Sequence, residues 1–177
     1  MSLHIIIGCM FSGKSTELIK RIKAAKEAGT TVLNIVHALD SSRYATSAIT
    51  THDQERVDAL ALTRLTEVSA CTLHKHDLIC IEEAQFFSDL YDAVFSFVND
   101  HGKQVIVCGL DGDYLAQPFT NMMRLIPIAD SIIKLTARCV VCGKAAMFSK
   151  RICADANVIL IGGSDKYQSV CRQHFYT

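Results

Sequence analysis

Residues 3–18, with the sequence LHIIIGCMFSGKSTEL, give the strongest indication of the fold. It contains the pattern G-x-x-x-x-G-K-[ST], placed after an apolar segment and at the start of a helical one. In that context the loop N–H groups and the positive end of the helix point at the phosphates of a nucleotide. The motif predicts an ATP site in which Lys14 reaches the β and γ phosphates and the Ser15 hydroxyl ligates Mg²⁺. Its members are Gly8, Cys9, Met10, Phe11, Ser12, Gly13, Lys14 and Ser15. The alternative is a glycine-containing turn with an unrelated lysine.

Five segments around this motif are apolar without the alternation of a half-exposed strand, so they predict buried strands of a parallel sheet. They are residues 3–7, 31–36, 78–81, 104–109 and 131–135. Helical spacing runs through 15–28, before Gly29, and through 89–100. Strands that alternate with helices predict an α/β fold with a mostly parallel sheet.

The pattern changes after residue 135, which places a domain boundary near Thr136. We expect a nucleotide-binding core over 1–135 and a small domain over 136–177. Within the core, residues 37–52 lack a clear period and are expected to form a long flexible loop. Asp53 is expected to cap a helix that begins at about Gln54.

Two acids follow a buried strand, as Glu82 and Glu83 come directly after 78–81. Proteins with a phosphate-binding loop use acids at such a strand end to hold the metal and to handle the nucleophile. Adjacent side chains of a strand point in different directions, so one carboxylate can face Mg²⁺ and the other the acceptor. The alternative is a pair of solvated turn residues.

Four residues with the spacing of metal ligands lie in the small domain: Cys139, Cys142, Cys171 and His174. A Cys₃His set in two paired knuckles is a recurrent structural zinc site, and four protein ligands leave no open position for catalysis. The alternative is a coincidence of two pairs. Cys9 lies beside a helix N-terminus and Lys14, surroundings that lower a thiol pKa, so a redox role is one interpretation of it. The other is a small residue tolerated in the loop.

Composition excludes several classes of protein. Half of the 177 residues are apolar, which argues against disorder, and 18 Lys and Arg balance 18 Asp and Glu. A neutral chain has no global field for nucleic acid or anionic lipid, and no apolar run approaches the length of a membrane helix. The first residues show no export signal, so we expect a cytoplasmic protein without nucleic-acid or membrane partners.

Five motifs together resemble the type II thymidine kinases of animals, bacteria and poxviruses. They are GCMFSGKSTEL (8–18), IEEAQFF (81–87), GLDGDY (109–114), CVVCGK (139–144) and IGGSDKYQSVCRQH (161–174). The resemblance covers nearly the whole chain. It implies a RecA-like P-loop core with a small zinc-ribbon or lasso domain, and transfer of the γ-phosphoryl group of ATP to the 5′-hydroxyl of thymidine. It departs at Glu82, where the family commonly has Asp, and at Cys9, where it often has Pro.

The resemblance also implies roles for individual residues. Glu83 is expected to be the general base, Glu82 to join Ser15 at Mg²⁺, and Arg43 and Gln85 to lie at ATP. The thymidine site is expected to comprise Tyr114, Phe86, Val158, Ile159, Leu160, Ile161, Gly162 and Tyr167, with the lasso gripping thymine largely through backbone groups. Residues 42–44 and 51–53 resemble the family's flexible loop. Arg43 and Arg151 are candidate stabilisers of the transferred charge, the alternative for each being a solvated surface arginine. A homotetramer inhibited by thymidine triphosphate is implied as well.

Two rival functions make different demands on the sequence. A zinc-ribbon protein that uses ATP to switch its grip on nucleic acid should carry a basic, aromatic-bearing face. A GTPase switch should carry N-K-x-D, which the chain lacks. Type I deoxynucleoside kinases resemble the chain only in the phosphate loop.

Overall fold

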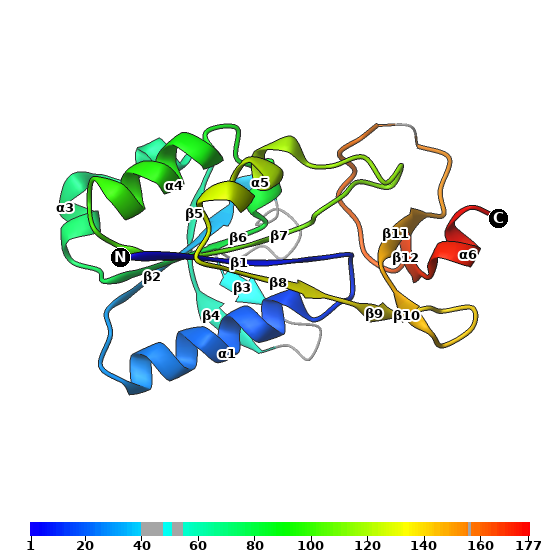
Figure 1. Ribbon diagram of the computed structural model, residues 1–177, viewed down its shortest axis with the longest axis horizontal. Coiled ribbons are helices and arrows are strands. Elements are labelled where there is room, and N and C mark those ends of the chain that lie inside the picture. Colours follow the sequence, from blue (N-terminus) through cyan, green and yellow to red (C-terminus); the bar gives the residue numbers. More distant parts are fainter. Residues whose placement is uncertain (40–47, 51–54, 156) are drawn as a thin grey trace.

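A parallel sheet forms the centre of the computed structural model, which describes residues 1–39, 48–50, 55–155 and 157–177. Within these residues the sheet has six strands in the order β5-β2-β6-β7-β1-β8, and every neighbouring pair is parallel (Figure 1). The strands are β1 (Ser2–Gly8), β2 (Val32–His37), β5 (Leu60–Leu62), β6 (Leu78–Glu82), β7 (Gln104–Gly109) and β8 (Ser131–Leu135). The predicted α/β fold and its parallel sheet are confirmed. Of the six strands in this sheet, the short β5 was not predicted.

Helices cover both faces of this sheet (Figure 1). Helix α1 (Lys14–Glu27) packs Leu18, Ile19 and Ile22 against one face. Gly29, with φ of 80°, follows its end in the left-handed region that glycine adopts without strain. The other face is covered by α3 (Ala70–His74), α4 (Leu90–Asn99) and α5 (Thr120–Arg124), and by the 3₁₀ turns η1 (Leu65–Glu67), η2 (Ala84–Phe86) and η3 (Ile126–Ile128).

Two expectations for the core were wrong. Strand β8 is not buried, because it pairs only with β1 at the sheet edge and leaves Ile132 40% exposed. Residues 55–58 do not start a helix: β4 (Arg56–Asp58) pairs antiparallel with β3 (Ala48–Thr50), which also lies inside the expected loop. Cross-strand pairing outweighed the local helix signal. The expected loop residues 42–44 and 51–53 lie outside the described part of the chain.

The chain after Thr136 builds small antiparallel pairs beyond the carboxyl end of the sheet (Figure 1). They are β9 (Ala137–Arg138) with β10 (Ala145–Ala146), and β11 (Phe148–Arg151) with β12 (Tyr167–Val170), followed by α6 (Arg172–Phe175). Among the described residues, no helix combines the length and the apolar character needed to cross a membrane.

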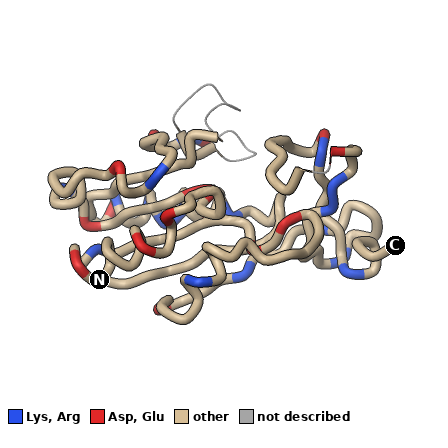
Figure 2. Tube along the Cα trace, turned by 90° about the horizontal axis from the view of Figure 1, so that it is seen from above, with Lys and Arg blue, Asp and Glu red and all other residues tan. Residues whose placement is uncertain are grey.

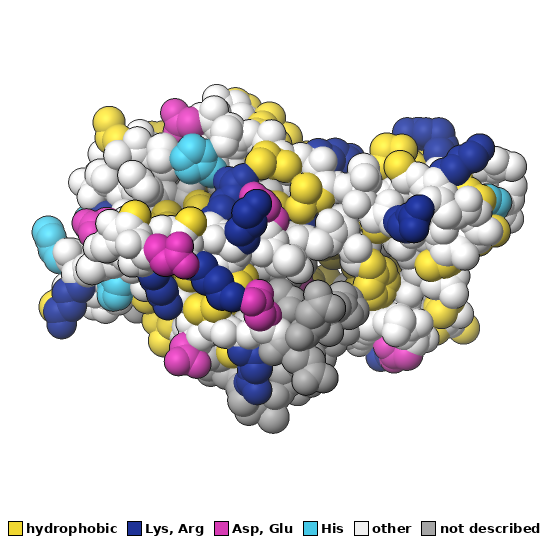
Figure 3. All heavy atoms as spheres, turned by 90° about the horizontal axis from the view of Figure 1, so that it is seen from below, with side chains coloured by type: hydrophobic (Ala, Val, Ile, Leu, Met, Phe, Trp, Pro, Cys, Tyr) yellow, Lys and Arg dark blue, Asp and Glu magenta, His cyan; other side chains and the backbone are white. Residues whose placement is uncertain are grey.

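Charge is distributed unevenly over the neutral chain. Residues 137–177 hold six Lys and Arg against two Asp and Glu, so the larger part of the chain is acidic (Figure 2). On the face drawn in Figure 3, both signs are interspersed over the larger lobe, whereas the smaller lobe shows mainly Lys and Arg. The zero net charge of the chain is therefore the sum of a basic lobe, residues 137–177, and an acidic remainder.

Candidate active site

The phosphate-binding loop leaves the end of β1 and enters α1. A Cβ at Gly8 would lie 2.4 Å from the Leu135 carbonyl oxygen, so only glycine fits this approach of β8. Gly13 precedes α1 with φ of 81°, again in the left-handed region. The Lys14 ammonium donates to the Cys9 carbonyl at 2.8 Å, and the Ser12 hydroxyl donates to the same oxygen at 2.8 Å. The Cys9 carbonyl thus accepts from two side chains of its own loop.

Glu82 lies at the end of β6, across from the start of α1. Its carboxylate is buried and accepts a hydrogen bond from the Ser15 hydroxyl at 2.5 Å, while its second oxygen has no partner among the described residues. Burial, followed by the charge of Glu83, raises the pKa of Glu82 to about 7. A hydroxyl beside a buried, half-satisfied carboxylate is a donor set that suits a hard cation such as Mg²⁺.

Glu83 turns the chain out of β6 in the left-handed region, with φ of 51°. Its side chain lines the same cleft as that of Glu82. Its carboxylate accepts a hydrogen bond from the Gln85 amide at 2.5 Å, and the Gln85 carbonyl accepts from the Leu110 N–H at 3.0 Å. Gln85 is buried, and its hydrogen bond holds the Glu83 carboxylate in place. The structure places it outside the cleft lining that was expected for an ATP contact.

One cleft at the carboxyl end of the sheet brings most of the predicted residues together. Glu82 and Glu83 both line this cleft. The other predicted residues that line it come from the phosphate loop, the core and the lasso: Met10, Phe11, Ser12, Gly13, Lys14, Ser15, Phe86, Tyr114, Val158, Ile159, Leu160, Ile161, Gly162 and Tyr167. Gly8 and Cys9 lie behind the loop and do not line it. Arg43 lies outside the described residues.

Sequence reasoning missed eight residues of the lining: Thr16, Ile49, Thr50, Leu110, Gly112, Asp113, Phe119 and Ser149. Leu110 to Asp113 follow β7, so the rule that ligands bind beyond the carboxyl ends of parallel strands would have found them. Ile49, Thr50 and Ser149 carry no such signal, because they reach the cleft from strands outside the main sheet.

We call the segment between β11 and β12 the lasso. Its apolar run, residues 158–161, is not a strand. Val158 and Ile159 are about half exposed, at 52% and 51%. Gly162 does not have a positive φ, so no left-handed backbone conformation requires a glycine there. A Cβ at Gly162 would instead lie 2.4 Å from the Lys166 side chain, whose ammonium donates to the Ile161 carbonyl at 3.0 Å.

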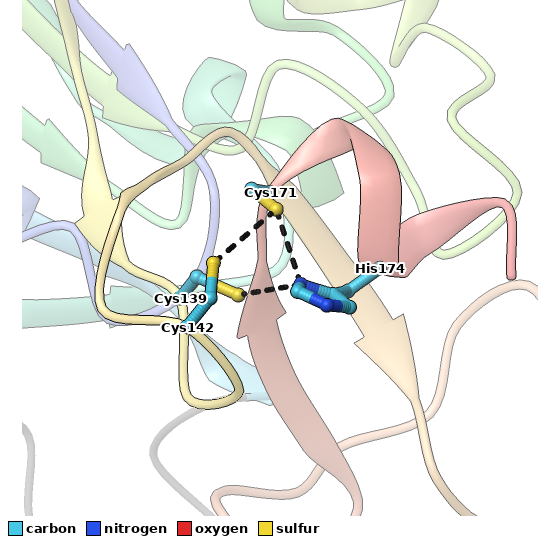
Figure 4. Close-up of side chains that lie close together, drawn as sticks. All are labelled: Cys139, Cys142, Cys171 and His174. Atoms are coloured by element: carbon cyan, nitrogen blue, oxygen red, sulfur yellow. Dashed lines mark hydrogen bonds between the residues drawn. The ribbon is translucent and has the colours of Figure 1, made fainter.

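The four predicted zinc ligands converge (Figure 4). Their ligand atoms all lie within 4.8 Å of one another. The Nδ1 atom of His174 lies 3.5 Å from the Cys139 sulfur and 3.3 Å from the Cys171 sulfur, and the sulfurs of Cys142 and Cys171 are 3.8 Å apart. Burial works against the thiolate of Cys139, but backbone N–H groups lower its pKa to about 5. The cluster therefore offers the donors that a tetrahedral Cys₃His zinc site requires.

The lobe formed by residues 137–177 packs directly on the phosphate loop. Cys9 lies in one apolar cluster with Cys139, Ala146 and Cys171, and its thiol donates to the Ala146 carbonyl at 3.4 Å. Burial raises the pKa of the Cys9 thiol, which opposes the thiolate that a redox role needs. The expectation of a lowered pKa was wrong because the lobe excludes water from this side of the loop.

A second contact joins the two parts at Ser149 of β11, whose hydroxyl accepts a hydrogen bond from the Met10 N–H at 2.9 Å. Ser149→Ala would leave that N–H without this partner, so we expect the Michaelis constant for ATP to rise by about 3- to 10-fold, the scale of one hydrogen bond. Ser149→Thr keeps the hydroxyl and is the matched control. If Ser149→Ala and the wild type have equal Michaelis constants for ATP, this contact does not shape the loop.

The fold and the cleft define a P-loop nucleotide-binding protein with a Cys₃His cluster. Comparison with known proteins narrows the class: the family model described as thymidine kinase matches residues 1–175. The chain belongs to the thymidine kinase family.

Curated relatives agree along nearly the whole chain. Thymidine kinase a of Arabidopsis thaliana is 46% identical over 180 residues, covering 99% of this chain and 75% of the relative. The thymidine kinase of Yaba monkey tumor virus (strain VR587) is 44% identical over 174 residues, covering 98% and 94%. That of Vaccinia virus (strain Western Reserve) is 42% identical over 171 residues, covering 97% and 94%.

Proposed function

We propose that this chain transfers the γ-phosphoryl group of ATP to the 5′-hydroxyl of thymidine and so supplies thymidine monophosphate by salvage. The observation that carries the proposal is a single cleft that joins a phosphate-binding loop, an acid pair and a wall of aromatic and backbone groups. The family match along 1–175 makes thymidine the expected acceptor.

Positioning supplies most of the catalysis in this reaction. The loop and Lys14 hold the phosphates, and the nucleoside lies between Tyr114 and the lasso with its 5′-hydroxyl toward Glu83. Glu83 accepts the hydroxyl proton while the O5′ atom forms a bond to the γ-phosphorus. The bond from that phosphorus to the β–γ bridging oxygen breaks, and ADP leaves.

Two metals fit the residues present. Ser15 and Glu82 would hold Mg²⁺, which neutralises charge on the phosphates when it is bound. Cys139, Cys142, Cys171 and His174 would hold a structural Zn²⁺, since four protein ligands fill its tetrahedral shell. We further propose a boundary at Thr136 between a 1–135 core and a 136–177 lasso domain, a cytoplasmic location, a homotetramer, and feedback inhibition by thymidine triphosphate.

Nucleic-acid binding by the basic lobe is the rival function. Three of the lobe's six cations are engaged with carbonyls of the chain itself: Lys150 with His174, Arg151 with the lasso and Lys166 with Ile161. A nucleic-acid surface needs its cations free for phosphates. ATP turnover measured with each of the four deoxynucleosides, beside DNA binding at low salt, separates the two functions: the proposal predicts stimulation by thymidine, and the rival predicts DNA binding without it.

Base selection should depend on the lasso backbone. Gly162→Val would displace Lys166 from the Ile161 carbonyl, so we expect the ratio of thymidine to deoxycytidine phosphorylation to fall by about tenfold or more, since misplaced backbone groups no longer reject the wrong pairing edge. Ile159→Ala, which truncates an exposed side chain, is the control and should change the ratio less. A Gly162→Val enzyme with an unchanged ratio would show that the lasso does not select the base.

A further inference from the structure

Strand β11 presents alternate side chains to two different parts of the molecule, as the period of a strand requires. On one side, Lys150 donates to the His174 carbonyl at 2.8 Å, and Phe148 stacks on Phe175 with ring centroids 4.6 Å apart. On the other side, Ser149 contacts the phosphate loop and Arg151 reaches the lasso. Arg151 thus comes from a strand that is anchored on both sides.

The guanidinium of Arg151 holds the lasso backbone. One terminal nitrogen donates to the Asp155 carbonyl at 2.9 Å and also to the Asn157 carbonyl. The other donates to the Val158 carbonyl at 3.2 Å and to the Tyr167 hydroxyl at 2.6 Å. A planar fork with fixed donors can bind several carbonyls of one curved segment at once, whereas an ammonium cannot reproduce that geometry.

The same network extends to the segment that lines the cleft. The Tyr167 hydroxyl, which accepts from Arg151, donates to the Leu160 carbonyl at 2.8 Å. Backbone on both sides of the exposed Val158 and Ile159 is therefore tied to one guanidinium, directly or through one hydroxyl.

Arg151 also contacts Tyr114, a cleft residue from the core. Its guanidinium carbon lies 3.7 Å from the centre of the Tyr114 ring and 5.2 Å from that of the Tyr167 ring. Tyr114 belongs to the segment that follows β7, so Arg151 spans from the core to the lasso. A cation over a ring face fixes the position of that ring as well as its own.

We propose that Arg151 is a positioning residue for nucleoside recognition: it fixes the lasso carbonyls and the Tyr114 ring at the spacing that admits a planar base. The inference rests on the proposed function and gives it a determinant of specificity. Both terminal nitrogens are committed to the lasso and to Tyr167, so Arg151 does not serve as a clamp on the transferred phosphoryl group.

Three variants test this proposal: Arg151→Ala, Arg151→Lys, and Arg138→Ala as a matched control. Arg138 is an exposed arginine of the same lobe, so the control removes the same charge. Arg151→Ala should raise the Michaelis constant for thymidine by roughly 10- to 100-fold, the scale for losing hydrogen bonds from a charged donor, and lower the thymidine to deoxycytidine ratio, with the constant for ATP nearly unchanged. Arg151→Lys should be impaired almost as strongly, because it keeps the charge without the fork.

Zinc content and the circular dichroism of each variant establish whether the lobe is folded. If Arg151→Ala does not fold, Arg151→Lys carries the test. If the folded Arg151 variants have Michaelis constants for thymidine within about twofold of the wild-type value, the proposal is overturned. A loss of turnover that Lys restores would also overturn it, since that pattern belongs to a charge stabiliser. A wild type that phosphorylates no thymidine would instead refute the proposed function.

Discussion

Glu83→Gln is expected to lower the turnover number by ~10² to 10⁴, the range for loss of a general base, while ATP affinity stays nearly intact. The amide has almost the same shape as the carboxylate and can still pair with Gln85, so the loss reports proton transfer and not a rearranged cleft. Single-turnover rates and the dissociation constant for ATP, measured on the same preparation, separate the two effects.

Glu27→Gln is the matched control, because Glu27 is an exposed carboxylate at the far end of α1. It should leave turnover unchanged. If Glu83→Gln keeps more than about half of the wild-type turnover, Glu83 is not the base.

Cys139→Ser is expected to lose zinc and to unfold the lobe after Thr136. Structural zinc contributes ~10 to 16 kcal/mol of apparent binding free energy in small modules, far more than the few short strands of this lobe can supply without it. Because Cys139 and Cys171 pack with Cys9 behind the phosphate loop, ATP binding should weaken as well.

Cys153→Ser is the control for this experiment, since Cys153 is an exposed cysteine of the same lobe outside the cluster. Elemental analysis should find one zinc per chain in the wild type and in the control, and well under one in Cys139→Ser. A wild type purified without chelator that holds far less than one zinc would contradict a structural metal site.

Local patterns predicted the parts of this fold that depend on neighbouring residues. Apolar runs identified the buried strands, helical spacing identified α1 and α4, and ligand spacing identified a cluster whose atoms lie within 4.8 Å of one another. The strand and helix signals are each contained in a short window and reflect burial of one face or of both. The ligand signal consists of two short pairs, Cys139 with Cys142 and Cys171 with His174.

Such local patterns could not predict contacts between segments that are distant in the sequence. Arg151 was expected to stabilise charge or to lie in solvent, yet it binds the lasso and Tyr114, because β11 and the segment after β7 meet only in the folded chain. The raised pKa of Cys9 has the same origin, since the lobe that buries it begins far along the chain. The edge position of β8 depended on strand order, which its own composition does not encode.

The fate of the γ-phosphoryl group shows whether this chain phosphorylates thymidine. Purified protein is incubated with ATP labelled at the γ-phosphate, Mg²⁺ and each of the four deoxynucleosides in turn, and the products are separated and identified. We expect label on the 5′-oxygen of thymidine, with little label on deoxycytidine or the purine deoxynucleosides. Release of labelled inorganic phosphate without transfer to thymidine, or equal transfer to thymidine and deoxycytidine, would contradict this expectation.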